Sequence, residues 1–147
     1  MTLANLLAIQ RLQAFEASPQ GVQRLLAAAE RNLADAQLQA LSAENRFDAA
    51  YKCILQCAML GLWAQGYRTP TSQPGHHQTT LQCLPLTMGL PNDVIIVLDA
   101  LRKQRNQNDN EGDPVSPAVV TECITQAKGL LAHTRQFLQN KFPSLLN

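Results

Sequence analysis

A run of basic and amide side chains occupies positions 102–110, Arg102-Lys-Gln-Arg-Asn-Gln-Asn-Asp-Asn110. Arg105 follows Leu101 by four residues, so on a helix it lies on the face that packs inward. A guanidinium on that face needs an acidic partner or a ligand, and its planar donors match the oxygens of a phosphate. The functional interpretation is therefore that Arg105 faces a cleft and holds a phosphate.

The position of Arg105 also allows a purely structural role. Its side chain can extend past the end of the helix, or pair with Glu44 or Asp48 at the start of a neighbouring helix. Periodicity alone favours this alternative, because a charged side chain on an apolar face is usually paired. A cleft around the Arg105 guanidinium would indicate a ligand, whereas a carboxylate of Glu44 or Asp48 bound to the guanidinium would indicate a structural ion pair.

Two adjacent histidines, His76 and His77, follow Pro74-Gly75 and open a predicted helix. The helix dipole disfavours a charged imidazole in the first turn, so a neutral ring that can act as a base or a ligand is expected. Either histidine could carry a proton if this helix start lies near the end of residues 102–110. Alternatively, one of them caps the helix or packs under the loop while the other is solvated. His133 is expected at the surface or at the rim of a dimer.

Other chemistry-bearing residues point to the core. Cys53 and Cys57 could bind a metal from one helical face, but their apolar neighbours favour buried, reduced thiols. Trp63 and Tyr67 could form a platform for a base, but only Arg68 adds charge nearby, so positions in the core and at its rim are expected. The sequence has no Walker-type glycine loop, no paired-carboxylate motif and no convincing metal-ligand spacing. We therefore expect no cofactor and no metal.

The elements that must position these residues are helices, because apolar residues recur every 3.6 positions rather than every two. Ser18, Ser42 and Ser116 are predicted N-caps. The expected helices cover residues 2–15, 19 to 36 or 41, 42–66, 76–84 with a kink or end at Pro85, 92 into the polar run 102–114, and 117 to about 138. Five or six helices with mostly short loops predict an all-α, up-and-down helical bundle.

Composition sets the limits of these expectations. The chain has 147 residues, 46% hydrophobic and 16% charged, with a formal net charge of +1. These values predict one folded domain over 1–147, with a core at about 19–141 and the N-terminal helix appended. They argue against disorder and against a broad nucleic-acid-binding surface. With no apolar run that could span a bilayer and no signal-peptide pattern, a cytoplasmic protein without a membrane partner is expected.

The Arg105-Asn106 pair after an apolar helix resembles the signature of the HEPN (higher eukaryotes and prokaryotes nucleotide-binding) domains. That signature is Arg, a polar residue that is commonly Asn, a short spacer and then His. The resemblance covers roughly residues 20–140 and includes Ala49-Ala50-Tyr51, Gly75-His76-His77 and the final helix after Gly112-Asp113. It implies a helical bundle that often forms a homodimer and, in active members, cuts RNA without a metal. It also implies a toxin–antitoxin or other defence setting beside a nucleotidyltransferase.

Asn110 stands where the shorter form of this signature has its catalytic His. An amide cannot transfer a proton near neutral pH, so ribonuclease activity is expected to be weak or lost. The leading hypothesis from this resemblance is that RNA or nucleotide phosphate still binds through Arg105 and Asn106, with Arg102 adding charge. A second hypothesis is a non-catalytic interaction module that docks a nucleotidyltransferase, an antitoxin or another protein. A third is an active metal-independent endoribonuclease that uses His76 or His77.

Overall fold

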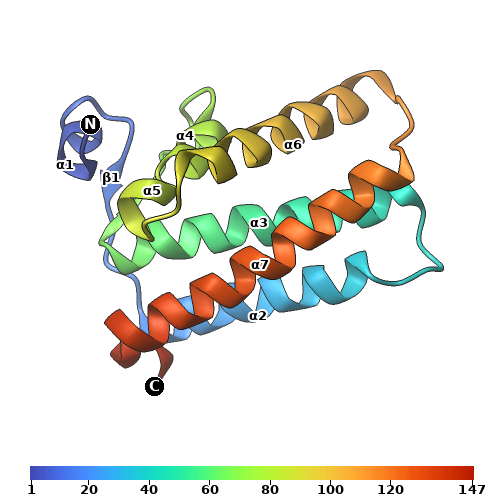
Figure 1. Cartoon of the computed structure of the whole chain (residues 1–147). Helices are drawn as coiled ribbons and strands as arrows, with labels where there is room; N and C mark the ends of the chain where they lie inside the picture. Colours follow the sequence, from blue (N-terminus) through green and yellow to red (C-terminus); the bar gives the residue numbers. More distant parts are fainter.

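The chain forms an all-α helical bundle, as predicted. The computed structural model describes residues 1–147. Figure 1 shows α3 in the middle, with α6 on one side and α2 and α7 on the other; α2 and α6 run in one direction and α3 and α7 in the opposite one. The elements are α1 (Leu3–Ala8), β1 (Gln13–Ala14), α2 (Pro19–Ala36), α3 (Ala43–Ala64), β2 (Tyr67–Arg68), α4 (His76–Gln82), α5 (Leu84–Thr87), α6 (Asn92–Glu111), α7 (Pro117–Lys141) and the 3-10 helix η1 (Pro143–Leu146).

Serine caps begin three of the four long helices. The side chains of Ser18, Ser42 and Ser116 each accept a hydrogen bond from the backbone N–H three residues later, at 2.9, 3.1 and 3.3 Å. Proline follows in the first turn of α2 and α7. These caps confirm the predicted helix starts, because each satisfies a donor that has no partner within the helix.

One cluster of 25 buried residues joins the long helices. The helices α3 and α7 contribute most of its residues. Those of α3 include Phe47, Tyr51 and Ile54, and α7 faces α3 with residues that include Val120, Cys123, Ala127, Leu131 and Leu138. All four cysteines are buried and free, as predicted. Burial raises the pKa of the Cys83 thiol to about 11 and that of Cys123 to about 12.

The N-terminal segment corrects the predicted helix over residues 2–15. Helix α1 ends at Ala8, Gln10 adopts a left-handed conformation with φ 63°, and the amides of Arg11 and Leu12 donate back to the Leu6 carbonyl. The chain then pairs β1 antiparallel with β2. A continuous helix would not deliver Leu12 to its buried site beside Leu62 and Cys83, so the burial of that side chain accounts for the turn.

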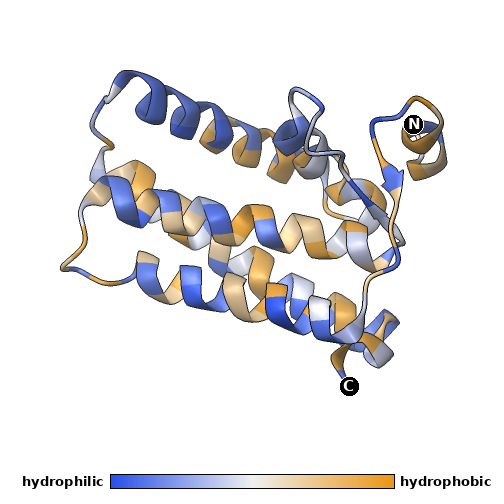
Figure 2. Cartoon of the chain, turned by 180° about the vertical axis from the view of Figure 1, so that it is seen from behind, coloured by the Kyte–Doolittle hydropathy of each residue, from blue (hydrophilic) through white to orange (hydrophobic).

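Two other helix ends fall within the predicted ranges. Helix α2 stops at Ala36, and Leu41 lies exposed in the loop that follows. Helix α6 continues through the polar run to Glu111 and ends at Gly112, whose φ of 71° suits a glycine. Figure 2 shows that the second half of α6 is almost entirely hydrophilic.

Candidate functional site

Arg105 lies on α6 against the start of α3. Its Nε donates to Asp48 Oδ1 at 3.1 Å and lies 3.4 Å from Asp109 Oδ2. Its Cζ is 5.2 Å from the centroid of the Tyr51 ring. The ion pair with Asp48 expected under the structural alternative is therefore present, and Glu44 takes no part in it. The terminal nitrogens Nη1 and Nη2 form no hydrogen bond, and the side chain is 21% exposed.

Arg102, one helical turn earlier, is held in the same way. Its Nε donates to Asp99 Oδ1 at 2.8 Å, while Lys103 Nζ lies 3.5 Å from the other oxygen. Burial opposes ionisation of Asp99, but the hydrogen bonds and charges of Arg102 and Lys103 prevail and hold the pKa of its carboxyl below the usual value. Because only Nε of Arg102 is bonded, both arginines keep their terminal nitrogens available.

Tyr51 lies beneath the guanidinium of Arg105. Its side chain is 1% exposed, and its hydroxyl has no hydrogen-bond partner. Burial raises the pKa of Tyr51 to about 12, although the charges of Arg105 and Arg102 oppose the rise. The hydroxyl is therefore neutral near pH 7, and it is a buried polar group of the kind that native proteins rarely leave unpaired.

His77 packs on the other side of Tyr51, with ring centroids 6.5 Å apart. Burial lowers the pKa of His77, and the charges of His76, Arg105 and Arg102 lower it further. The His76 ring meets it edge-on at 4.4 Å. The start of α4 is thus brought next to the arginines of α6, and His77 is neutral at pH 7. We call Arg102, Arg105, Tyr51 and His77 the arginine site.

The two remaining predicted residues do not join this site. Asn106 and Asn110 are exposed and their side chains form no hydrogen bonds within the chain. Asn110 follows Arg105 by five residues, which places it about 140° further around the helix. Asp109, four residues after Arg105, takes the neighbouring position instead. Within one chain, the residue that replaces the motif His faces away from the arginine.

His133 corrects another expectation, since it is not a free surface side chain. It is half-buried, and its Nε2 lies 2.9 Å from the Met88 carbonyl oxygen, which ties α7 to the end of α5. Trp63 occupies the predicted position at the rim of the core, with its ring centroid 5.0 Å from that of Phe15.

Sequence reasoning missed the roles of Asp99 and of the Tyr51 hydroxyl. Asp99 stands three residues before Arg102, a spacing that favours an ion pair on a helix and was available as a signal. Tyr51 belongs to the apolar stripe of α3, and nothing in that pattern distinguishes its ring from a phenylalanine.

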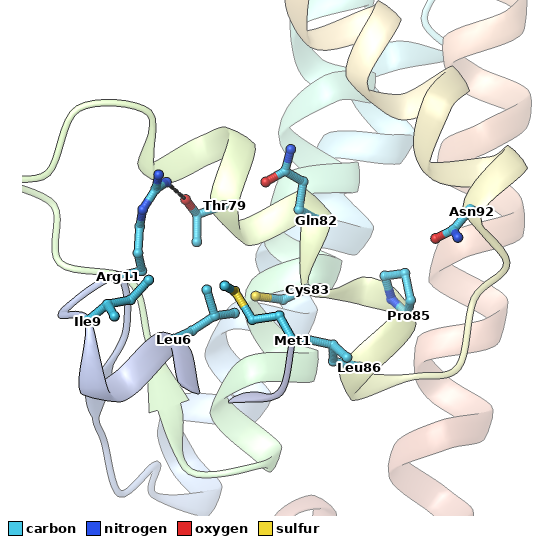
Figure 3. Close-up of a pocket in the computed structure, with 10 residues that line it drawn as sticks. All are labelled: Met1, Leu6, Ile9, Arg11, Thr79, Gln82, Cys83, Pro85, Leu86 and Asn92. Carbon is cyan, nitrogen blue, oxygen red and sulfur yellow. Dashed lines mark hydrogen bonds between the residues drawn. The ribbon is translucent and has the colours of Figure 1, made fainter. Parts of the chain in front are cut away.

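None of the cavities in the molecule is lined by Arg102 or Arg105. The arginine site is therefore not an enclosed cavity, and the side chains of Arg102 and Arg105 are 14% and 21% exposed. One cavity of about 370 Å³ lies between α1 and the α4–α5 region (Figure 3). Its side chains include Leu6, Cys83 and Arg11, whose Nη1 donates to Thr79 Oγ1 at 3.2 Å. It contains none of the predicted site residues.

A second cavity, of about 300 Å³, lies between α3 and the start of α4 and includes His76 and His77.

No group of three or more His, Cys, Asp and Glu side chains is placed to hold a metal ion. No helix is long and apolar enough to cross a membrane. No family model, curated protein or solved structure matches this chain.

Proposed function

We propose that this chain binds the phosphate groups of RNA or of a nucleotide through Arg102 and Arg105, with weak or no ribonuclease activity. One observation carries the proposal. Each guanidinium is held at Nε by a carboxylate, from Asp99 and Asp48, while Nη1 and Nη2 are left without partners. An arginine oriented in this way loses little freedom when its terminal nitrogens bind two phosphate oxygens.

The lack of an enclosing cavity at the site favours a chain of phosphates over an enclosed small molecule. The net charge of +1 excludes a broad electrostatic attraction, so the contact must be local. Arg102 and Arg105 lie one helical turn apart, and Asn106 is exposed beside them with its amide free. With two cations in the contact, the affinity should depend only weakly on salt concentration.

The expectation of weak cleavage follows from the acid–base groups. Cleavage of RNA without a metal needs groups that exchange protons with the 2′-OH and the leaving oxygen. Tyr51, with its pKa raised to about 12, does not ionise near pH 7, and Asn110 faces away from Arg105. His77 and His76, whose ring centroids lie 4.4 Å apart, remain as candidate proton carriers beside the site.

A second candidate is an interaction module, and the Asp48–Arg105 ion pair favours it because the pair closes one edge of the guanidinium. In that case the polar second half of α6 docks a nucleotidyltransferase, an antitoxin or another protein. A homodimer and a role in a toxin–antitoxin or defence system remain predictions from the resemblance to HEPN domains, and so does a ribonuclease that uses His76 or His77.

The test is fluorescence anisotropy with a labelled, short single-stranded RNA. Arg105→Ala and Arg102→Ala should each weaken binding about tenfold, the loss of one charge-assisted contact. Arg31→Ala, which removes the same charge from the exposed face of α2, should change binding less than twofold. Equal effects of all three substitutions, or no binding by the unsubstituted protein, would refute the proposal and leave the interaction module.

Cleavage is tested on the same RNA in the presence of a chelator. The RNA should remain intact over hours. Cleavage that disappears in His77→Ala, in a protein that still folds, would instead establish the active ribonuclease.

A further inference from the structure

The 300 Å³ cavity beside the arginine site, which we call the α3–α4 pocket, has two chemically different walls. Its α3 wall is apolar and includes Leu55, Met59 and Trp63. The opposite wall comes from α4 and the segment before it, and carries Thr71, His76 and His77. Its volume is at the lower end of the range for small-molecule sites.

Part of the polar wall is already hydrogen-bonded: Thr80 Oγ1 donates to the His76 carbonyl oxygen at 2.7 Å and lies 3.3 Å from Thr69 Oγ1. The free groups belong to Thr71, His76 and His77. His76 Nδ1 lies 3.2 Å from the Gln73 carbonyl oxygen, so it must donate there and its Nε2 is left as an acceptor. Neither ring nitrogen of His77 forms a hydrogen bond, and neither does the Thr71 hydroxyl.

Arg68 brings the only permanent charge to the pocket, and its guanidinium has no carboxylate partner. Its Nε donates to Gln13 Oε1 at 2.6 Å, and its Cζ lies 4.8 Å from the centroid of the Phe15 ring. The pairing of β1 with β2 holds this end of the pocket wall in place. An apolar wall that includes Trp63 and faces the free hydrogen-bonding groups of Thr71 and His77 suits a flat ring with hydrogen-bonding edges.

The pocket and the arginines are linked through Tyr51. His77 lines the pocket and packs against the Tyr51 ring at 6.5 Å, while Arg105 lies over the same ring at 5.2 Å. We infer that the α3–α4 pocket binds a nucleobase, taken from the same RNA or nucleotide whose phosphate the arginines bind. The connection to the phosphate rests on the proposed function, whereas the pocket's fit to the base does not.

Trp63, the only tryptophan in the chain, provides a direct readout because it lines the pocket. Uncharged adenosine and uridine, added separately, should change its fluorescence saturably after correction for light absorbed by the nucleoside. Thr71→Tyr, which places a ring at the pocket, should weaken this binding at least tenfold. The adjacent substitution Ser72→Tyr is the matched control, since Ser72 is also exposed but does not line the pocket, and it should leave binding within twofold.

A second pair of measurements separates this inference from the proposed function. Arg105→Ala should leave nucleoside binding within twofold while weakening RNA binding about tenfold. If nucleosides do not bind, or Thr71→Tyr binds them as well as Ser72→Tyr does, the nucleobase pocket is refuted even where Arg105→Ala still weakens RNA binding. If nucleosides bind but RNA binding is insensitive to Arg105→Ala, the pocket stands and the phosphate proposal fails.

Discussion

The guanidinium of Arg105 lies over the ring of Tyr51, with 5.2 Å between Cζ and the ring centroid. Its Nε also donates a hydrogen bond to Asp48, which lies one turn before Tyr51 on α3. This contact fastens the polar second half of α6 to the central helix. The same arginine that could bind a phosphate therefore also supports the fold, and the two roles need separate measurements.

Removal of this contact should lower stability modestly. Arg105→Ala is expected to reduce the free energy of unfolding by about 1 kcal/mol, since a partly exposed ion pair and a cation–π contact each contribute at most about that much. A double-mutant cycle with Asp48→Asn, measured by urea denaturation, should give a coupling energy of about 0.5 to 1 kcal/mol. Lys103→Ala serves as the control, because its side chain is 71% exposed and the change should stay within about 0.5 kcal/mol. A coupling energy near zero would show that the pair does not form in solution.

The Tyr51 hydroxyl should be dispensable for folding. It is buried without a hydrogen-bond partner, so Tyr51→Phe removes an unsatisfied polar group and is expected to leave the free energy of unfolding unchanged or to raise it by up to about 1 kcal/mol. Urea denaturation of Tyr51→Phe and of Tyr67→Phe, at the half-buried second tyrosine of the chain, makes the comparison. A loss of more than about 1 kcal/mol for Tyr51→Phe alone would mean that the hydroxyl is hydrogen-bonded in solution.

Local signals in the sequence determined most of the bundle. Serine caps at 18, 42 and 116 and a 3.6-residue apolar period fixed where three helices begin and which faces they bury. The errors arose where contacts distant in sequence decide the conformation. Leu12 turns away from a helical path because its burial site is formed by Leu62 and Cys83, residues about fifty to seventy positions further along the chain.

The candidate site shows the same limit. Helical spacing placed Arg105 inward and made Asp48 a possible partner, and both expectations hold. The approach of His77 to Tyr51 depends on how the start of α4 packs across α3, which no local pattern encodes. The orientation of Asn110 could have been predicted from the sequence. If the helix continues through the polar run to Glu111, as it does, five residues separate Arg105 and Asn110 and place their side chains about 140° apart around the helix.

The free energy of unfolding should decrease at acidic pH because of His77. Its folded-state pKa is lowered, first by burial and then by the charges of His76, Arg105 and Arg102, so the unfolded chain takes up a proton more readily. The stabilisation is present above the unfolded pKa, near 6.5, and is lost as the pH falls through it. Thermal unfolding at pH 7.5 and pH 5 should show a smaller acid-induced decrease in Tm for His77→Gln than for the unsubstituted protein. Equal decreases would exclude His77 as a cause.

Two helical glycines should respond in opposite directions to the same substitution. A Cβ at Gly61 in α3 would lie 2.8 Å from Thr87 Oγ1 and 3.3 Å from the Met88 side chain, whereas a Cβ at Gly129 in α7 would meet nothing within 4 Å. Gly129→Ala should therefore raise the free energy of unfolding by about 0.5 to 1 kcal/mol, the helix preference of alanine over glycine. Gly61→Ala gains the same preference but must displace the buried Thr87 side chain, so a net loss of about 1 to 2 kcal/mol is expected. Urea unfolding curves with unchanged slopes would report both effects as changes in midpoint. If Gly61→Ala instead stabilised the protein as much as Gly129→Ala, α5 would not be packed against α3 as closely as the 2.8 Å approach requires.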